Sequence, residues 1–254
     1  MKYLKVSRYI VADTIPAIKV YYAILLVVIT FFATVSISSE GSLRSSGLEM
    51  ASVIFLLVAG LNSFKSSFKF TQANNISRTA FSKGLIVGTF PIALLMSVLD
   101  LIINRVYNAF VPSPTNFDMI YGSYRDRGMG SAGGEGIVWE QANGALSLLG
   151  TVLWQFALYS AIFLLGVLIT LVFYRSTKVI KAFIFAFPVI LFLVINNTYG
   201  LLPVALQNAS GQFIAGAFGW QSRNPYMAIL SFGILGAVFA LCIYLLVRRA
   251  EIRE

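Results

Sequence analysis

Long uncharged apolar runs are the feature that most constrains the fold of this chain. Hydrophobic residues make up 58% of its 254 positions and charged residues only 11%, whereas a soluble domain carries about 25% charged residues. The runs reach the roughly 20 residues that a helix needs to cross a bilayer core about 30 Å thick. Because lipid offers no hydrogen-bond partners to the backbone, such runs fold as helices. The sequence therefore predicts an all-α integral membrane protein with a single transmembrane domain, residues 1–254.

Six spans fit the pattern, at about 20–37, 48–64, 84–103, 145–174, 182–199 and 227–247. The difficult stretch is 182–222, which has no charged residue and is long enough for two spans. Its second half contains Pro203, Gln207, Asn208 and many glycines, a composition that is poor for a lipid-facing helix. We therefore expect one span, followed by a re-entrant or interfacial segment at 200–220 that packs against protein. The alternative, a seventh span, would move the C-terminus to the other side.

The cations are distributed unequally between the two sides of this topology. Fourteen of the 19 lysines and arginines fall on one side, in residues 2–19, 65–83, 175–181 and 248–253. The positive-inside rule then predicts a multi-pass protein of a bacterial cell membrane with both termini in the cytoplasm. Residues 1–19 are expected to form an interfacial helix that turns inward at Pro16. The loop 104–144 is expected to be extracellular, as a cap or as a gate.

Several kinds of chemistry have no residues to support them. The chain has no histidine, a single cysteine and no GxxxxGK[ST] phosphate-binding loop. We therefore expect neither an enzyme nor a metal or cofactor site in this chain. The net charge of +9 is explained by cytoplasmic lysine and arginine, so no nucleic-acid partner is expected.

A few polar residues interrupt the predicted spans. Asp100 lies inside the third span, five residues before Arg105, and we expect either an ion pair between them or a position along a transport pathway. Asn62, Asn196 and Asn197 are the remaining polar residues of this kind. Amides in spans mostly hydrogen-bond a neighbouring helix, and contact with cargo is the alternative.

The loop between the second and third spans, 65–83, is basic and contains no acid. In "NSFKSSFKFTQANNISRTAFSKG", Lys65 and Lys69 are four residues apart, as are Phe64 and Phe68. On a helix this spacing places a basic ridge beside an aromatic ridge. Such a surface suits docking into a groove of a soluble protein. The alternative is that the cations only contact anionic lipid headgroups.

The layout resembles the permease subunits of ABC exporters of the second type. Those proteins have an interface helix, a cytoplasmic coupling helix and a re-entrant hairpin, at places that correspond here to residues 3–19, 62–83 and 200–220. The motif that carries the resemblance is "FKFTQANNISRTAFSKG". Among such exporters the chain is most similar to the family that exports phenol-soluble modulins, which are amphipathic peptides.

The resemblance implies partners and site residues. The expected partners are separately encoded cytosolic ATPase subunits that hold ATP and Mg, a second permease copy or a paralogue, membrane lipids, and an amphipathic peptide cargo. The implied ATPase-coupling residues are Phe64, Lys65, Phe68, Lys69, Asn75, Ser77 and Arg78. Candidate pathway or gate residues are Asn62, Asp100, Arg105, Asn196 and Asn197. Two rival functions remain, a secondary transporter and a non-transporting sensor or immunity protein.

Overall fold

The computed structural model describes residues 2–38, 46–122, 141–176, 186 and 203–248, and those residues form helices without any strand. The predicted all-α fold is thus confirmed for this part of the chain. The helices, in chain order, are α1 (Lys2–Ser38), α2 (Glu49–Ser63), α3 (Lys65–Ala73), α4 (Arg78–Asn108), α5 (Asn116–Ile120), α7 (Ala145–Arg175), α9 (Val204–Ala217) and α10 (Pro225–Arg248).

Five helical stretches of the described chain are long and apolar enough to cross a membrane. They are Lys2–Ser38, Glu49–Ala73, Arg78–Asn108, Ala145–Arg175 and Pro225–Arg248. Each contains one of the predicted spans, so five of the six predicted segments are helices of suitable length. Apart from residue 186, the predicted span 182–199 lies outside the described residues, as do Asn196 and Asn197, and a sixth span stays a prediction.

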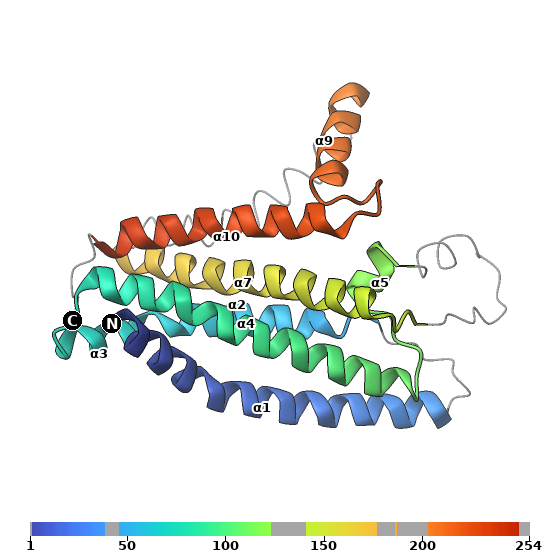
Figure 1. Ribbon diagram of the computed structural model, residues 1–254, viewed down its shortest axis with the longest axis horizontal. Coiled ribbons are helices and arrows are strands. Elements are labelled where there is room, and N and C mark those ends of the chain that lie inside the picture. Colours follow the sequence, from blue (N-terminus) through green and yellow to red (C-terminus); the bar gives the residue numbers. More distant parts are fainter. Residues whose placement is uncertain (1, 39–45, 123–140, 177–185, 187–202, 249–254) are drawn as a thin grey trace.

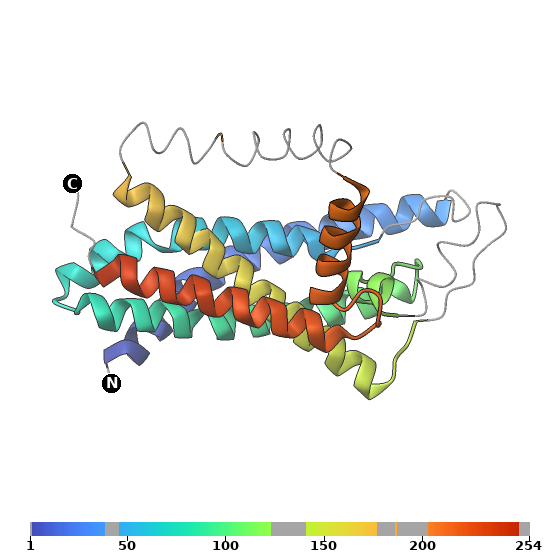
Figure 2. The ribbon, with the colours of Figure 1, turned by 90° about the horizontal axis from the view of Figure 1, so that it is seen from above.

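The five long helices form an elongated bundle with two distinct ends (Figure 1). We call them the α3 end and the α5 end, after the short helix found at each. α1 and α4 run from the α3 end to the α5 end, and α2, α7 and α10 run the opposite way (Figure 2). α7 packs against α2, α4 and α10, while α1 packs mainly on α4.

Glycines let α2 and α7 approach each other closely. A Cβ atom on Gly60 would lie 2.3 Å from the carbonyl oxygen of Phe163, and one on Gly166 would lie 2.4 Å from that of Leu57. The hydroxyl of Thr170 also donates a hydrogen bond of 2.6 Å to the carbonyl oxygen of Leu61 on α2. Small residues at such contacts are typical of helix packing in membranes.

α1 continues as one helix through Pro16, and its N-terminal part is bent relative to the rest (Figure 1), so the turn at Pro16 stays a prediction. The buried side chains before and after Pro16, such as Ile10 and Ile18, form one stripe along the helix, and packing of that stripe on α4 keeps the helix intact. α1 and α4 stay in register, because Val6 lies against Gly84 and Tyr22 bonds to Asp100, a constant offset of 78 residues. Whether residues 1–19 lie in a membrane interface stays a prediction.

α9 projects from the bundle near the α5 end (Figure 1). Leu206, Phe213 and Ile214 are exposed, so the described residues do not cover this side of α9, and a re-entrant or interfacial segment at 200–220 stays a prediction. Two hydrogen bonds hold its C-terminal end. The hydroxyl of Tyr121 donates to the carbonyl oxygen of Phe218 at 2.6 Å, and that of Ser231 donates to the carbonyl oxygen of Ala217 at 2.6 Å.

Candidate functional sites at the two ends of the bundle

The turn between α3 and α4 explains two of the predicted coupling residues structurally. Asn75 has a φ of 54°, in the left-handed region, where asparagine is one of the few residues commonly found. Ser77 is the N-cap of α4, and its Oγ accepts a hydrogen bond from the backbone N–H of Ala80 at 3.3 Å. Arg78 is the first residue of α4 and is half-buried. The turn therefore fixes where α3 lies relative to α4.

The aromatic ridge of α3 faces the core, so the expectation that Phe64 and Phe68 dock on a partner is wrong. Both rings are 0% exposed and stack on each other with centroids 5.2 Å apart. They also contact Phe81 on α4 and Tyr174 on α7. The four-residue spacing predicted correctly that they share a face, and burial of apolar area turns that face inward. We call these four rings the aromatic clamp.

The opposite face of α3 remains accessible. Lys65 and Lys69 are exposed, and Phe70 is half-exposed and stacks on Tyr9 of α1 with centroids 4.7 Å apart. Other exposed cations at the same end of the bundle are Lys2, Lys5, Arg8, Lys83 and Arg248. The basic half of the predicted docking surface is thus at the surface, with Phe70 as its aromatic residue.

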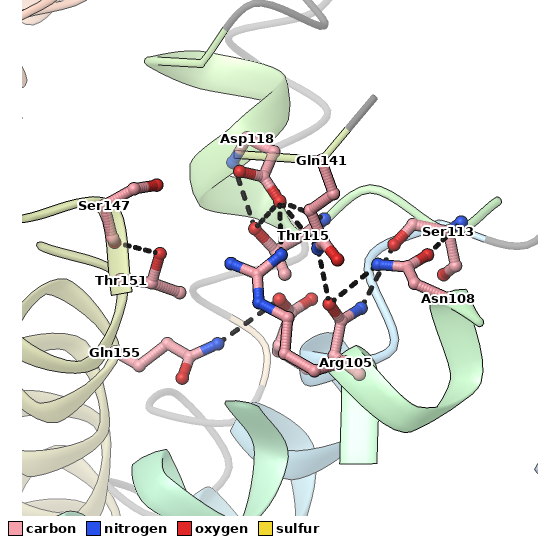
Figure 3. Close-up of polar contacts among 11 residues, drawn as sticks. Arg105, Asn108, Ser113, Thr115, Asp118, Gln141, Ser147, Thr151 and Gln155 are labelled. Carbon is pink, nitrogen blue, oxygen red and sulfur yellow. Dashed lines mark hydrogen bonds and ion pairs between the residues drawn. The ribbon is translucent and has the colours of Figure 1, made fainter. Parts of the chain in front are cut away.

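A second site is a buried group of polar side chains toward the α5 end (Figure 3). It draws residues from α2, α4, α5, α7 and the segment before α7. We call it the polar cluster: Glu49, Asp100, Asn104, Arg105, Asn116, Asp118, Gln141 and Gln155.

Asp100 is held by two tyrosines rather than by an arginine. The hydroxyl of Tyr22 donates to its Oδ1 at 2.8 Å, and that of Tyr159 donates to its Oδ2 at 2.5 Å. The predicted ion pair with Arg105 is wrong, because side chains five residues apart on a helix point about 140° away from each other. Arg105 instead lies 4.0 Å from the Oδ2 of Asp118. Asp100 thus fastens α1 to α4 and α7.

Glu49 is the buried acid that sequence reasoning missed, because it follows a Gly/Ser-rich loop. Its side chain lies in the polar cluster and the residue is only 2% exposed. Its Oε1 accepts a hydrogen bond from the Nε2 of Gln155 at 3.2 Å, and its Oε2 accepts one from the Nδ2 of Asn116 at 3.5 Å. In the sequence, Gln155 could have indicated a buried polar residue such as Glu49. It is an amide in the middle of a long apolar run, and such an amide needs a polar partner on a neighbouring helix.

Asp118 anchors α5 to the bundle. It forms a capping box with Thr115 at the start of α5, and the Nε2 of Gln141 donates to its Oδ2 at 3.3 Å. Burial raises the pKa of the Asp118 carboxyl, while the hydrogen bond from Thr115 and the charge of Arg105 act in the opposite direction. Gln141 also donates to the Oδ1 of Asn104 at 3.0 Å. The polar cluster thereby joins α4, α5 and the segment before α7.

Asn62, the other predicted pathway residue within the described chain, bonds to its own helix. Asn62 is exposed, and its Nδ2 donates to the carbonyl oxygen of Val58 on its own helix at 3.1 Å. Within the described part of the chain, the expected bond to a neighbouring helix is not made. Among the described residues, no three His, Cys, Asp or Glu side chains lie close enough together to hold a metal ion.

At a coarse level, these features define an all-helical protein with several helices able to cross a membrane, a basic α3 end and a buried polar cluster near its other end. Comparisons with protein-family models, with curated proteins and with solved structures found no match to the chain.

Proposed function

We propose that this chain is the permease subunit of an ABC exporter, which moves amphipathic peptides or other hydrophobic cargo across a bacterial cell membrane as a dimer. ATP hydrolysis takes place in separate cytosolic subunits. The observation that carries the proposal is the two-sided nature of α3, which has a basic accessible face and a face fixed in the bundle by the aromatic clamp.

The accessible face of α3 provides the docking part of this function. Lys65, Lys69 and Phe70 stand on one short helix at an end of the bundle that carries many other exposed cations. Positive charge of this kind attracts and orients an acidic groove on a soluble partner. In the proposed topology the α3 end is cytoplasmic, because it holds most of the cations.

The aromatic clamp provides the transmission part. Phe64 and Phe68 are fully buried between α4 and α7, and packed interiors transmit displacement because they contain little free volume. A partner that moves α3 therefore moves α2, α4 and α7 with it. This is the mechanical link that an exporter needs between a cytosolic ATPase and its membrane helices.

Two rival functions make different use of the same features. A secondary transporter would be driven by an ion gradient without any ATPase. A sensor or immunity protein would use the basic α3 end for a non-transporting partner or for lipid headgroups. Co-purification with an ATPase whose turnover responds to cargo favours the exporter, and ion-driven uptake by the chain alone favours the first rival.

Charge reversal tests the docking role. In proteoliposomes that contain the permease and its ATPase, we expect Lys69→Glu with Arg78→Glu to lower cargo-stimulated ATP hydrolysis about 30-fold or more, which is the scale of a hot-spot interaction. Lys2→Glu with Lys5→Glu, the same change of charge on α1 at this end, is the matched control and should lower the stimulation much less. Normal membrane insertion of all variants is checked in parallel. Unchanged stimulation in the double variant would refute the docking role.

A conservative change in the aromatic clamp tests transmission separately. Phe68→Leu keeps the exposed face of α3, so the ATPase should still bind with unchanged affinity. Because the ring contacts to Phe81 and Tyr174 are lost, the amount of cargo moved per ATP should fall. Equal loss of binding and of transport would contradict a separate transmission role.

A further inference from the structure

The polar cluster contains more acids than cations. Glu49, Asp100 and Asp118 are 2%, 5% and 2% exposed, and Arg105 is the cation among them. With every group ionised, the cluster would hold an excess of two negative charges. Burying an uncompensated charge costs several kcal/mol, so an additional positive charge would stabilise the cluster.

The three acids differ in how well they are compensated. Asp118 has Arg105 nearby and Thr115 donates to its carboxylate. Asp100 accepts hydrogen bonds from two tyrosine hydroxyls. Glu49 accepts two side-chain amide hydrogen bonds, of 3.2 and 3.5 Å, besides weaker contacts with backbone N–H groups, and forms no ion pair within 4.0 Å among the described residues. Glu49 is therefore the carboxylate that most needs a positive ligand.

Gln155 independently indicates a missing ligand beside Glu49. It is 0% exposed, and its side chain extends from α7 to Glu49, to which its Nε2 donates (Figure 3). Its Oε1 is buried and has no hydrogen-bond partner among the described residues. A buried amide oxygen of this kind normally accepts a hydrogen bond, so a donor is needed next to the carboxylate.

A small cavity lies between the carboxylates of Glu49 and Asp100. It is lined by Leu25, Ile29, Leu48, Glu49, Asp100, Ile103 and Asn104, and its volume is about 10 Å³. That volume is close to the minimum for a single water molecule. The described residues bring no three His, Cys, Asp or Glu side chains together around a metal ion.

We propose that Glu49 holds a proton in the folded chain and exchanges it through a water in the cavity that it shares with Asp100. A hydronium ion gives its proton to the carboxylate and remains as water. The ionisable groups that interact electrostatically with Glu49 are Asp100 and Arg105 on α4, Asp118 on α5 and Tyr159 on α7. Loss of the proton adds a negative charge beside Asp100 and Asp118, and the repulsion loosens the α5 end.

Reversible unfolding of the full chain in mixed detergent micelles tests the proposal. In the unfolded chain, a glutamate loses its proton above about pH 4.3. If Glu49 keeps its proton in the folded chain, the folded state binds one proton more than the unfolded state. The folded-to-unfolded ratio then falls about tenfold for each further pH unit. Between about pH 5 and pH 7, Glu49→Gln should therefore show a slope smaller than wild type by about one proton. Asp13→Asn removes an exposed acid of α1 and should leave the slope unchanged. Asp118 titrates in all three proteins, so the difference isolates Glu49.

Equal slopes in wild type and Glu49→Gln would overturn the proposal. So would stabilisation of wild type, but not of Glu49→Gln, by sodium ions at constant pH, because this result assigns the site to a metal cation. Infrared spectroscopy covers the case in which Glu49→Gln fails to fold. Wild type at neutral pH should show the carbonyl band of a protonated carboxylic acid that shifts when only glutamate is labelled with ¹³C. A spectrum without such a glutamate band also overturns the proposal.

Discussion

The close contact between α2 and α7 gives the most direct prediction from the structure. A Cβ on Gly166 would lie 2.4 Å from the carbonyl oxygen of Leu57, about 1 Å less than the 3.4 Å at which ordinary contact begins. Gly60 meets the carbonyl oxygen of Phe163 in the same way, at 2.3 Å. Since the atoms in the way are backbone, no side-chain rotation relieves the clash, and the two helices have to separate.

The cost of Gly166→Ala follows from that separation. Overpacking a closely packed site costs about 1–3 kcal/mol. A shift of about 1 Å also stretches the bond of 2.6 Å from Thr170 to Leu61, and bonds of this kind contribute about 0.6 kcal/mol in membranes. We therefore expect a loss of about 2–4 kcal/mol in the free energy of unfolding, which lowers the folded-to-unfolded ratio at least about 30-fold.

The assay is reversible unfolding in detergent, with a matched glycine as control. A Cβ atom on Gly233 in α10 would have no other atom within 4 Å, so Gly233→Ala should leave stability unchanged or raise it by up to about 1 kcal/mol through helix propensity. If Gly166→Ala is as stable as Gly233→Ala, the close packing of α2 on α7 is refuted.

Two further predictions concern the polar cluster. Tyr159→Phe removes the hydroxyl that donates a hydrogen bond to Asp100, and it should cost about 1–3 kcal/mol of unfolding free energy. Tyr226→Phe, at an exposed site, should cost nothing. Equal stability of the two variants would contradict the role of Tyr159. Because burial raises the pKa of Asp118, the folded chain keeps this proton to a higher pH than the unfolded chain, whose aspartates titrate near about 3.9. The contribution of Asp118 to stability is then greatest below the unfolded pKa and declines as pH rises through the folded pKa. Asp118→Asn should therefore make the free energy of unfolding less dependent on pH in this range. An unchanged pH dependence would contradict the raised pKa of Asp118.

The helices could be predicted from the sequence because a long apolar run in lipid has few other ways to satisfy its backbone. The direction of individual side chains could not. The spacing of Phe64 and Phe68 shows that they share a face, but periodicity does not say which face is inside. Both rings proved to be buried, and the docking face of α3 is the one with Lys65 and Lys69.

The polar cluster was predicted only in part, because its contacts join residues far apart in the chain. Asp100 was correctly singled out as an acid within a helix, but its partners Tyr22 and Tyr159 lie 78 and 59 residues away. Glu49 was not singled out, because it lies at the edge of the predicted span 48–64, directly after glycine and serine residues. Its bond to Gln155 spans 106 residues, and a contact of that range depends on how the helices pack.

The register between α1 and α4 has a consequence for Lys19. With an offset of 78 residues, Lys19 lies level with Ser97, well within the apolar run of α4, and it is exposed. A lysine that faces lipid at the middle of a bilayer costs about 2.5–3.5 kcal/mol, whereas water or a second protein chain against α1 removes that cost. The reactivity of a cysteine placed at position 19 toward a water-soluble thiol reagent therefore reports directly whether this side of the bundle faces hydrocarbon.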